Sequence, residues 1–244
     1  MKIAFISDTH TLHNKMWHQL PEVDMLIHCG DVSSRGKEGE ITDFIYWYMN
    51  LTGFDKKIFI AGNHDFGFEH FPKYDWLMHL INEENLSQSD CVYLEDDSFV
   101  IQHPDLSRPI KIYGSPWQPE FYNWAFNLPR NGAEIQRKWN RIPEDTDILI
   151  THGPPMGILD EAYGYGKIMD HVGCEILKNR IEIVKPLIHA FGHIHGSYGG
   201  KYVGDTLYIN ASTCDEKYVP INKPIVVEIT EVYGELVAQY LGDD

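Results

Sequence analysis

The chain of 244 residues carries 36 Asp and Glu against 20 Lys and Arg, a formal net charge of -16, and 43% of its residues are hydrophobic. This content is sufficient for one buried core, so we expect a single domain over residues 1–244, and no apolar run in the sequence reaches membrane-spanning length. The negative charge repels long polyanions, so we expect no long nucleic acid as partner, and without such an apolar run we expect no membrane.

Six short apolar runs without polar alternation predict buried strands. They lie at 2–7, 24–29, 57–61, 148–151, 187–191 and 206–210. Such runs are typical of strands covered on both faces, which requires packed layers above and below a sheet. Near 38–51, an apolar face that includes Ile41, Phe44 and Tyr48 predicts a helix.

A second group of strand candidates has hairpin-like spacing. They lie at 92–96, 98–103, 110–114, 225–230 and 235–241. Turns are predicted around Asp96 and Asp97 and at Gly234. Two sheets flanked by helices accommodate both groups, so the sequence predicts an α/β fold.

The cysteines favour a reducing compartment. Cys29, Cys91, Cys174 and Cys214 are widely spaced and form no CxxC pair. This spacing favours buried thiols over disulfides or zinc ligands. With a charged Lys2 at the start of the chain, we expect a cytoplasmic protein. The sequence leaves its oligomeric state open.

Five short motifs end apolar runs, and each supplies Asp, His or Asn in place of a catalytic Ser or Cys. In chain order they provide Asp8, His10, Asp31, Asn63, His152, His193 and His195. Oxygen and imidazole ligands that meet at strand ends are what a pair of divalent metal ions needs. One such residue alone is more often a structural, hydrogen-bonded group. Five motifs in one chain favour a metal centre.

Residue chemistry predicts a role for each ligand. A carboxylate can bridge two cations, and Asp31 follows a glycine that permits a sharp turn, so we predict that Asp31 bridges the ions. The first site is predicted to contain Asp8, His10 and His195, and the second Asn63, His152 and His193. Mixed nitrogen and oxygen ligands accept Mn, Fe, Zn, Ni or Co.

The motifs resemble the ordered signature of the calcineurin-like metallophosphoesterases. They are DTH at 8–10, GD at 30–31, GNHD at 62–65, THGPP at 151–155 and GHIH at 192–195. Stretches at 114–130, 171–177 and 208–213 resemble the branch of the vertebrate metallophosphoesterase-domain proteins, which is related to the UPF0046 group. The resemblance implies a four-layer α/β/β/α sandwich of two mixed β-sheets flanked by helices. It also implies a dinuclear metal centre at the carboxyl ends of the strands, with manganese favoured.

The resemblance also implies a mechanism in which a metal-bridging hydroxide attacks phosphorus in line. His64 is then expected to protonate or stabilise the leaving oxygen, with Asp65 orienting its ring. Arg35 is expected to hold a phosphate oxygen. The alternative for His64 is a structural histidine in a turn, and the alternative for Arg35 is an exposed arginine in a loop. Many family members continue the second motif as GDxxD, whereas this chain reads GDVSSRG at 30–36.

For function, we expect a phosphodiesterase that hydrolyses small phosphodiesters or nucleotides, such as 2′,3′- or 3′,5′-cyclic AMP or GMP. The alternatives are a phosphomonoesterase acting on phosphoproteins or small phosphates, and a nucleotide-binding regulatory protein with little turnover. The aromatic residues at 117–126 could stack a nucleobase or pack in the core. The glycines at 163–166 could form a lid or an ordinary loop. Among the other histidines, only His13 is a candidate for the site.

Overall fold

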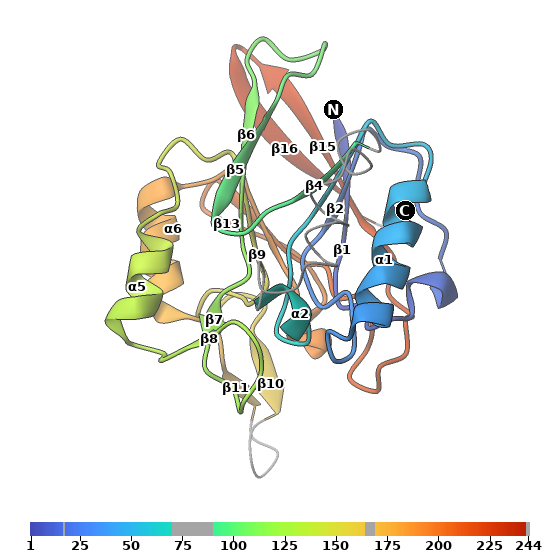
Figure 1. The fold of residues 1–244 in the computed structure, drawn as a ribbon. Helices are drawn as coiled ribbons and strands as arrows, with labels where there is room; N and C mark the ends of the chain where they lie inside the picture. Colours follow the sequence, from blue (N-terminus) through green and yellow to red (C-terminus); the bar gives the residue numbers. More distant parts are fainter. Residues whose placement is uncertain (17, 70–89, 164–168, 243–244) are drawn as a thin grey trace.

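Two six-stranded sheets pack face to face in this computed structural model, which describes residues 1–16, 18–69, 90–163 and 169–242 (Figure 1). The first sheet contains β1 (Lys2–Ile6), β2 (Met25–His28), β3 (Lys56–Phe59), β4 (Cys91–Tyr93), β15 (Ile225–Val232) and β16 (Glu235–Leu241). The second contains β5 (Asp97–Ile101), β6 (Ile110–Ser115), β9 (Ile148–Thr151), β12 (Ile188–Phe191), β13 (Gly199–Val203) and β14 (Thr206–Asn210). Their apolar inner faces form the central core.

Both sheets are mixed, with a parallel centre. The first runs in the order β16-β15-β1-β2-β3-β4. Its strands β1 to β4 are parallel to one another, β15 pairs antiparallel with β1, and β16 pairs antiparallel with β15. The second runs β13-β14-β12-β9-β6-β5, with antiparallel strands at its two edges. The carboxyl ends of the central strands therefore meet at one edge of the sandwich, where loops gather.

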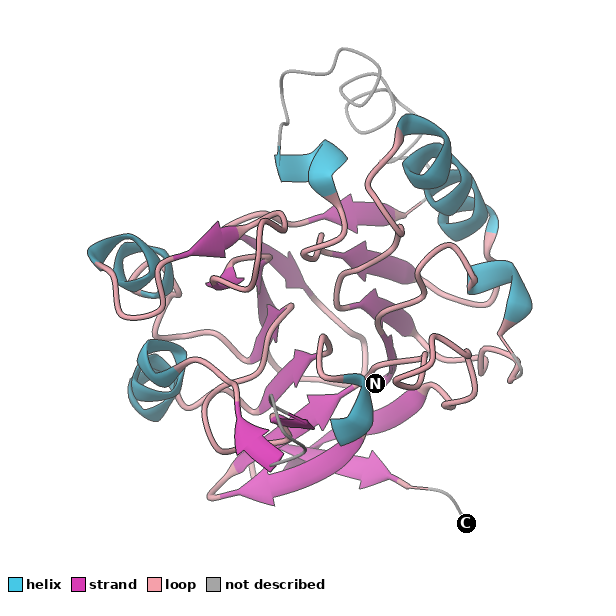
Figure 2. Cartoon of the chain, turned by 90° about the horizontal axis from the view of Figure 1, so that it is seen from below, coloured by secondary structure: helices cyan, strands magenta, loops and turns pink. Residues whose placement is uncertain are grey.

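Helices cover the outer face of each sheet, which completes four layers (Figure 2). The helix α1 (Glu38–Asn50) packs Phe44 and Tyr48 on the first sheet, while α5 (Ala133–Trp139) and α6 (Glu175–Val184) pack on the second. The smaller elements are η1 (His13–Lys15), α2 (Phe66–Glu69), β7 (Gln118–Pro119), β8 (Asn127–Leu128), β10 (Glu161–Tyr163), β11 (Met169–His171) and η2 (His195–Ser197). Among the described helices, none has both the length and the apolar character to cross a membrane.

The structure confirms the predicted α/β sandwich, its strands and the helix near 38–51. The turn at Gly234 is also confirmed, because β15 and β16 pair across it. The hairpin around Asp96 and Asp97 is wrong, since β4 and β5 belong to different sheets. Asp96 sits where the chain crosses between the sheets and accepts hydrogen bonds from Ser115 Oγ at 2.7 Å and Lys138 Nζ at 2.6 Å. All four cysteines are buried thiols.

Candidate metal centre

The predicted ligands follow strands whose carboxyl ends meet at one edge of the sandwich. Asp8 and His10 follow β1, Asp31 follows β2, Asn63 follows β3, His152 follows β9, and His193 and His195 follow β12. Backbone hydrogen bonds continue the pairing of β1 with β2 beyond the strands. Asp8 N donates to Gly30 O at 2.9 Å, and His10 N donates to Asp31 O at 3.1 Å. These loops are therefore fixed to each other directly below the ligands.

Four ligand residues have a backbone conformation that residues other than glycine rarely adopt. The angle φ is +52° at Asp8, +43° at His10, +57° at Asp31 and +66° at His193. Such outliers persist only where surrounding contacts hold them, and they cluster at functional sites. Hydrogen bonds between the motifs supply such contacts here, since His193 N donates to Asp8 Oδ2 at 3.0 Å and His64 N donates to Asp31 Oδ1 at 2.8 Å.

Two motif glycines allow the backbone to approach the ligand side chains closely. A Cβ atom at Gly62 would collide with Asp31 Oδ1 and with His152 Cε1. A Cβ atom at Gly192 would collide with Asp8 Oδ2. Any larger residue at these positions would push the carboxylates out of place. Steric contact with the ligand side chains therefore explains why the GNHD and GHIH motifs begin with glycine.

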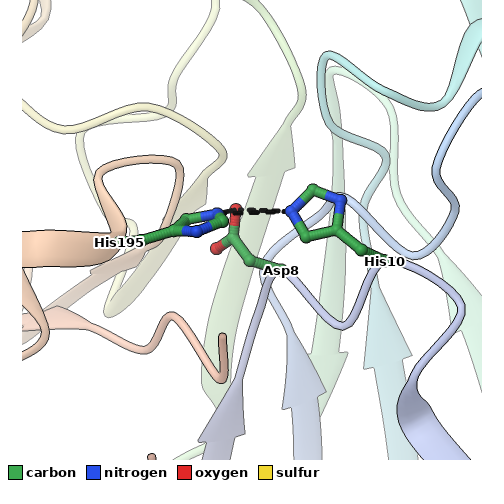
Figure 3. A group of neighbouring side chains, drawn as sticks. All are labelled: Asp8, His10 and His195. Carbon is green, nitrogen blue, oxygen red and sulfur yellow. Dashed lines mark hydrogen bonds and ion pairs between the residues drawn. The ribbon is translucent and has the colours of Figure 1, made fainter. Parts of the chain in front are cut away.

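The first group of ligands contains Asp8, His10 and His195 (Figure 3). Nε2 of His195 lies 3.2 Å from Asp8 Oδ1 and 3.2 Å from Nε2 of His10. Nε2 of His10 lies 3.9 Å from Asp8 Oδ1. One carboxylate oxygen and two ring nitrogens thus face a common point, as the sequence predicted for the first site.

Asp31 lies between the two predicted sites. Its Oδ2 is 3.8 Å from His10 Nε2 and 3.3 Å from His152 Nε2. His10 belongs to the first predicted site and His152 to the second. This position agrees with a bridging carboxylate, which stays a prediction.

The second group of ligands contains Asp31, His152 and His193. Asn63 joins it, because Oδ1 of Asn63 lies 3.0 Å from Nε2 of His152. The rings of His152 and His193 are 5.1 Å apart. The structure therefore brings all seven predicted ligand residues into one continuous cluster.

Hydrogen bonds on the far side of three rings fix which nitrogen faces this cluster. Nδ1 of His10 is 3.3 Å from Ser33 O, Nδ1 of His152 is 2.9 Å from Cys29 O, and Nδ1 of His195 is 2.9 Å from Asp215 O. A carbonyl oxygen only accepts, so each Nδ1 carries a proton and each ring turns its Nε2 toward the cluster, where the neutral form of the ring would offer a lone pair. Imidazole nitrogens and carboxylate oxygens that converge in this way fit divalent cations.

The charges of the metal-free cluster can be read from the pKa values. Burial alone would lower the pKa of His152, but the charge and hydrogen bond of Asp31 raise it to about 9. Burial would likewise lower the pKa of His195, and the hydrogen bond and charge of Asp8 raise it to about 9. Burial lowers the pKa of His10 to about 4. Asp31 and Asp8 therefore favour positive charge on His152 and His195, as they would favour a bound cation.

The pKa of Asp8 shows the same balance from the carboxylate side. Burial would raise this pKa, but the hydrogen bond and charge of His195 hold it well below its ordinary value. Ser212 adds a further hydrogen bond, in which Oγ donates to Asp8 Oδ2 at 3.0 Å. Sequence reasoning missed Ser212 as a partner of this ligand, although it lies in the stretch at 208–213 that carries the family resemblance.

His64 adjoins the cluster and is oriented by a backbone carbonyl. Its Nδ1 is 2.9 Å from Ser34 O, and its Nε2 is 3.9 Å from Asp31 Oδ2. The ring stacks on Trp124 at 4.1 Å and meets His10 edge to face at 4.6 Å. Ser34 stands where many family members carry the second Asp of GDxxD, and its carbonyl oxygen orients the histidine.

The predicted contact between Asp65 and the His64 ring is wrong. The buried carboxylate of Asp65 instead accepts hydrogen bonds from Ser33 N at 2.9 Å, Ser33 Oγ at 2.6 Å and Gly62 N at 2.8 Å. It thereby holds the loop whose carbonyls orient His10 and His64. Asp65 supports the site through the backbone, a role that its place beside His64 does not reveal.

Arg35 lies at the rim of the cluster and is exposed. Its Cζ is 5.0 Å from the centre of the Trp124 ring, the same ring that stacks on His64. This places the guanidinium beside the site without a contact to a ligand residue. The predicted binding of a phosphate oxygen by Arg35 stays a prediction.

The aromatic segment at 117–126 divides between core and surface. Trp117 and Phe126 pack against each other at 5.4 Å and belong to the apolar cluster that also contains the buried residues of α1. Phe121 and Tyr122 are 52% and 63% exposed and line a cavity of about 480 Å³ that reaches His193. Residues 164–168, which include most of the predicted lid, lie outside the described residues.

His13 does not belong to the site. Its ring lies 4.7 Å from the Trp47 ring, and its Nε2 is 3.1 Å from Asp43 Oδ2. Both partners lie on α1. The closeness of His13 to the first motif along the chain therefore does not translate into closeness in space.

Comparisons with known proteins identify similar sequences and folds. The sequence profile of the calcineurin-like phosphoesterase family matches residues 1–197. Metallophosphoesterase domain-containing protein 1 of Homo sapiens is 42% identical over 244 residues, which cover 93% of this chain and 71% of the human protein. A UPF0046 protein of Caenorhabditis elegans is 36% identical over 238 residues, or 94% of this chain and 81% of the worm protein. In fold, phosphopantetheinyl hydrolase from Mycobacterium tuberculosis is similar with a TM-score of 0.55 at 17% identity, covering 99% of this chain and 96% of that chain.

Proposed function

We propose that this chain, which belongs to the calcineurin-like phosphoesterase family and is a metal-dependent phosphoester hydrolase, cleaves small phosphodiesters. Cyclic nucleotides, namely 2′,3′- or 3′,5′-cyclic AMP and GMP, are the substrates that we would test first. The family implies a dinuclear metal site, and the ligand groups described above fit such a site.

Two adjoining cavities next to the ligand cluster support the proposed preference for diesters. The cavity of about 480 Å³ extends from His193 past Phe121 and Tyr122. A second, more open cavity lies beside Trp124 and shares Phe121 and Tyr122 with the first. A diester carries organic groups on two phosphate oxygens and needs room on both sides of phosphorus, whereas a monoester needs room on one. The first cavity has the volume of a typical small-molecule site.

When bound, two divalent ions supply Lewis-acid stabilisation of the transferring phosphoryl group and lower the pKa of a water molecule. His64 is then the proton donor of the proposal. Because Ser34 O holds its Nδ1, its Nε2 points toward the cluster and can carry a proton to the leaving oxygen. Stacking on Trp124 keeps the ring in this orientation. The chain thus presents a fixed general acid beside its candidate metal ligands.

The negative net charge limits the kinds of substrate that we propose. The net charge of -16 opposes a long polyanion, so the proposal is restricted to small phosphodiesters and nucleotides. Manganese is the proposed metal, and the cytoplasm is the proposed compartment. Metal analysis of the chain purified without added metal tests the identity of the metal. Microscopy of the tagged full-length protein in its own cells tests the compartment.

Product formation from four substrates tests the proposed activity. They are 2′,3′-cyclic AMP, 3′,5′-cyclic AMP, bis(4-nitrophenyl) phosphate and 4-nitrophenyl phosphate, each assayed with chelator and with added Mn²⁺. Metal-dependent cleavage that favours a diester supports the proposal. Preference for the monoester would instead identify a phosphomonoesterase, and no turnover by the metal-loaded protein would favour a nucleotide-binding role.

A further inference from the structure

Tyr218 lies against three histidines of the site. Its ring centre is 4.8 Å from that of His10, 5.2 Å from that of His195 and 6.3 Å from that of His64. The other side of the residue faces solvent, since 49% of its surface is exposed. Tyr218 therefore lines the ligand cluster beside His10 and His195, with His64 next to them.

The position of Tyr218 is fixed by a strained and heavily bonded loop. Its φ is +58°, a value that residues other than glycine rarely adopt. Tyr218 N donates to Asp215 O at 2.9 Å, while Lys217 N and Val219 N both donate to Asp215 Oδ1 at 2.9 Å. Asp215 O also accepts the bond from His195 Nδ1 at 2.9 Å. One residue thus ties the tyrosine loop to a metal ligand.

Packing alone does not account for this ring. Tyr218 is absent from the described hydrophobic core clusters and remains half exposed. Tyr233 offers a contrast, because it has a similar φ of +53° but is fully exposed in the turn between β15 and β16. Strain at Tyr233 serves a hairpin turn, whereas strain at Tyr218 holds a ring against the ligands. Backbone strain that positions a side chain at a site is a reason to look for function there.

A second exposed ring stands on the other side of the cluster. The Phe121 ring centre is 6.3 Å from that of His193, and Phe121 is 52% exposed. His193 belongs to the second predicted metal site, whereas His10 and His195 belong to the first. The open face of the centre is therefore flanked by one aromatic ring at each predicted site.

We propose that Tyr218 is a substrate-contacting specificity residue that packs its ring against an organic group of the phosphoester. This inference rests on the proposed function for the nature of the substrate, an ester whose organic group presents a flat ring such as a nucleobase or an aryl group. Stacking of one base on one aromatic side chain contributes roughly tenfold to affinity. The ring makes the contact, and the phenol hydroxyl is not required for it.

Equilibrium binding to the full-length, Mn²⁺-loaded chain tests the assignment without relying on turnover. The probes are inorganic phosphate, which has no organic group, and phenylphosphonate, whose ring is joined to phosphorus by a bond that water does not cleave. Tyr218→Asn should weaken phenylphosphonate binding about tenfold and phosphate binding less than twofold. Tyr218→Phe should leave both affinities within about twofold of the original. Asn adopts positive φ more readily than Tyr, so the first variant should keep its melting temperature and its metal content.

Tyr233→Asn is the matched control, because it relieves similar strain far from the ligands and should change neither affinity. Equal weakening of phosphate and phenylphosphonate by Tyr218→Asn would overturn the proposal, because Tyr218 would then act through the metal ligands. Unchanged phenylphosphonate binding would also overturn it. If Tyr218→Asn does not fold, Tyr218→Gly replaces it with the same expected ratio. Failure of the proposed function is a separate result, namely no diester turnover by the unmodified chain.

Discussion

Nε2 of His10 lies 3.2 Å from Nε2 of His195, although both Nδ1 atoms already face backbone carbonyls. Two imidazole lone pairs cannot face each other at this distance without a positive charge between them. A proton on His195 supplies that charge in the metal-free chain, where its pKa is about 9 and that of His10 is about 4. Metal ions would replace such protons, which couples metal binding to pH.

Metal binding should therefore release protons at neutral pH. At pH 7, His152 and His195 are protonated, since the pKa of each is raised to about 9, and ligation requires their neutral form. Calorimetric titration with Mn²⁺ in buffers of different ionisation enthalpy measures the number released. We expect about two protons per chain at pH 7 and fewer above pH 9. A proton count independent of pH would contradict the assignment.

The same shifts predict how the stability of the chelated protein changes with pH. Both pKa values are raised above the ordinary 6.5, so the stabilisation from these two histidines is fully present below about pH 6.5. It is lost as the pH rises through about 9. The melting temperature of the chelated chain should therefore fall between pH 6.5 and 9, and Mn²⁺ should restore it. A melting temperature that rises over this range in chelator would argue against the charged pairs.

Asp31→Asn should loosen both metals together. Oδ2 of Asp31 faces His10 on one side and His152 on the other, and the amide lacks the charge that attracts a shared pair of cations. Equilibrium dialysis followed by metal analysis should find both metals lost from Asp31→Asn. Asp43→Asn is the control, because Asp43 is exposed on α1 and should keep both. An Asp31 variant with two metals and full turnover would remove the bridging assignment.

His64→Ala should separate catalysis from metal binding. We expect turnover to fall by roughly 10²–10⁴, the usual range for loss of a general acid, while metal content stays the same. The loss should be largest for diesters with poor leaving groups and smaller when the leaving group is 4-nitrophenol, which departs without a proton. Rates measured across such a series decide the role. An unchanged rate for a poor leaving group would show that His64 does not donate the proton.

Ser212→Ala should weaken metal binding at the first site through Asp8. Removing the hydroxyl deletes the 3.0 Å bond to Asp8 Oδ2, and loss of such an orienting partner costs roughly 10–100-fold in metal affinity. Competition with a chromophoric chelator measures the affinity of each site. Ser107→Ala, in an exposed loop between β5 and β6, should have no effect. Equal affinities in the two variants would mean that Asp8 needs no support from Ser212.

The sequence was sufficient to locate the sheets because their central strands are buried on both faces and read as plain apolar runs. It missed the edge strand β13, whose Gly-Gly-Lys-Tyr-Val sequence is largely exposed. It also paired β4 with β5, because a short spacing resembles a hairpin even where the chain crosses to another sheet. Burial produces a strong pattern, whereas exposed edges and crossings do not.

The residues of the candidate ligand cluster could likewise be predicted, because side-chain chemistry at strand ends is visible in the sequence. Their supports could not, since Ser33, Ser34 and Asp215 act through carbonyl oxygens that every residue has. Asp65 was assigned to His64, the residue before it in the chain, whereas its carboxylate binds the backbone of Ser33. The position of Tyr218 could not be predicted either, because it requires a positive φ that tyrosine rarely adopts.

The most direct test of the account is to add Mn²⁺ stepwise to chelator-stripped protein and to follow cleavage of bis(4-nitrophenyl) phosphate and 4-nitrophenyl phosphate in parallel. We predict no product without metal, a rate that saturates as the second ion binds, and a faster reaction with the diester. Cleavage that persists in chelator, or a rate that saturates with one ion per chain and favours the monoester, would contradict a dinuclear phosphodiesterase.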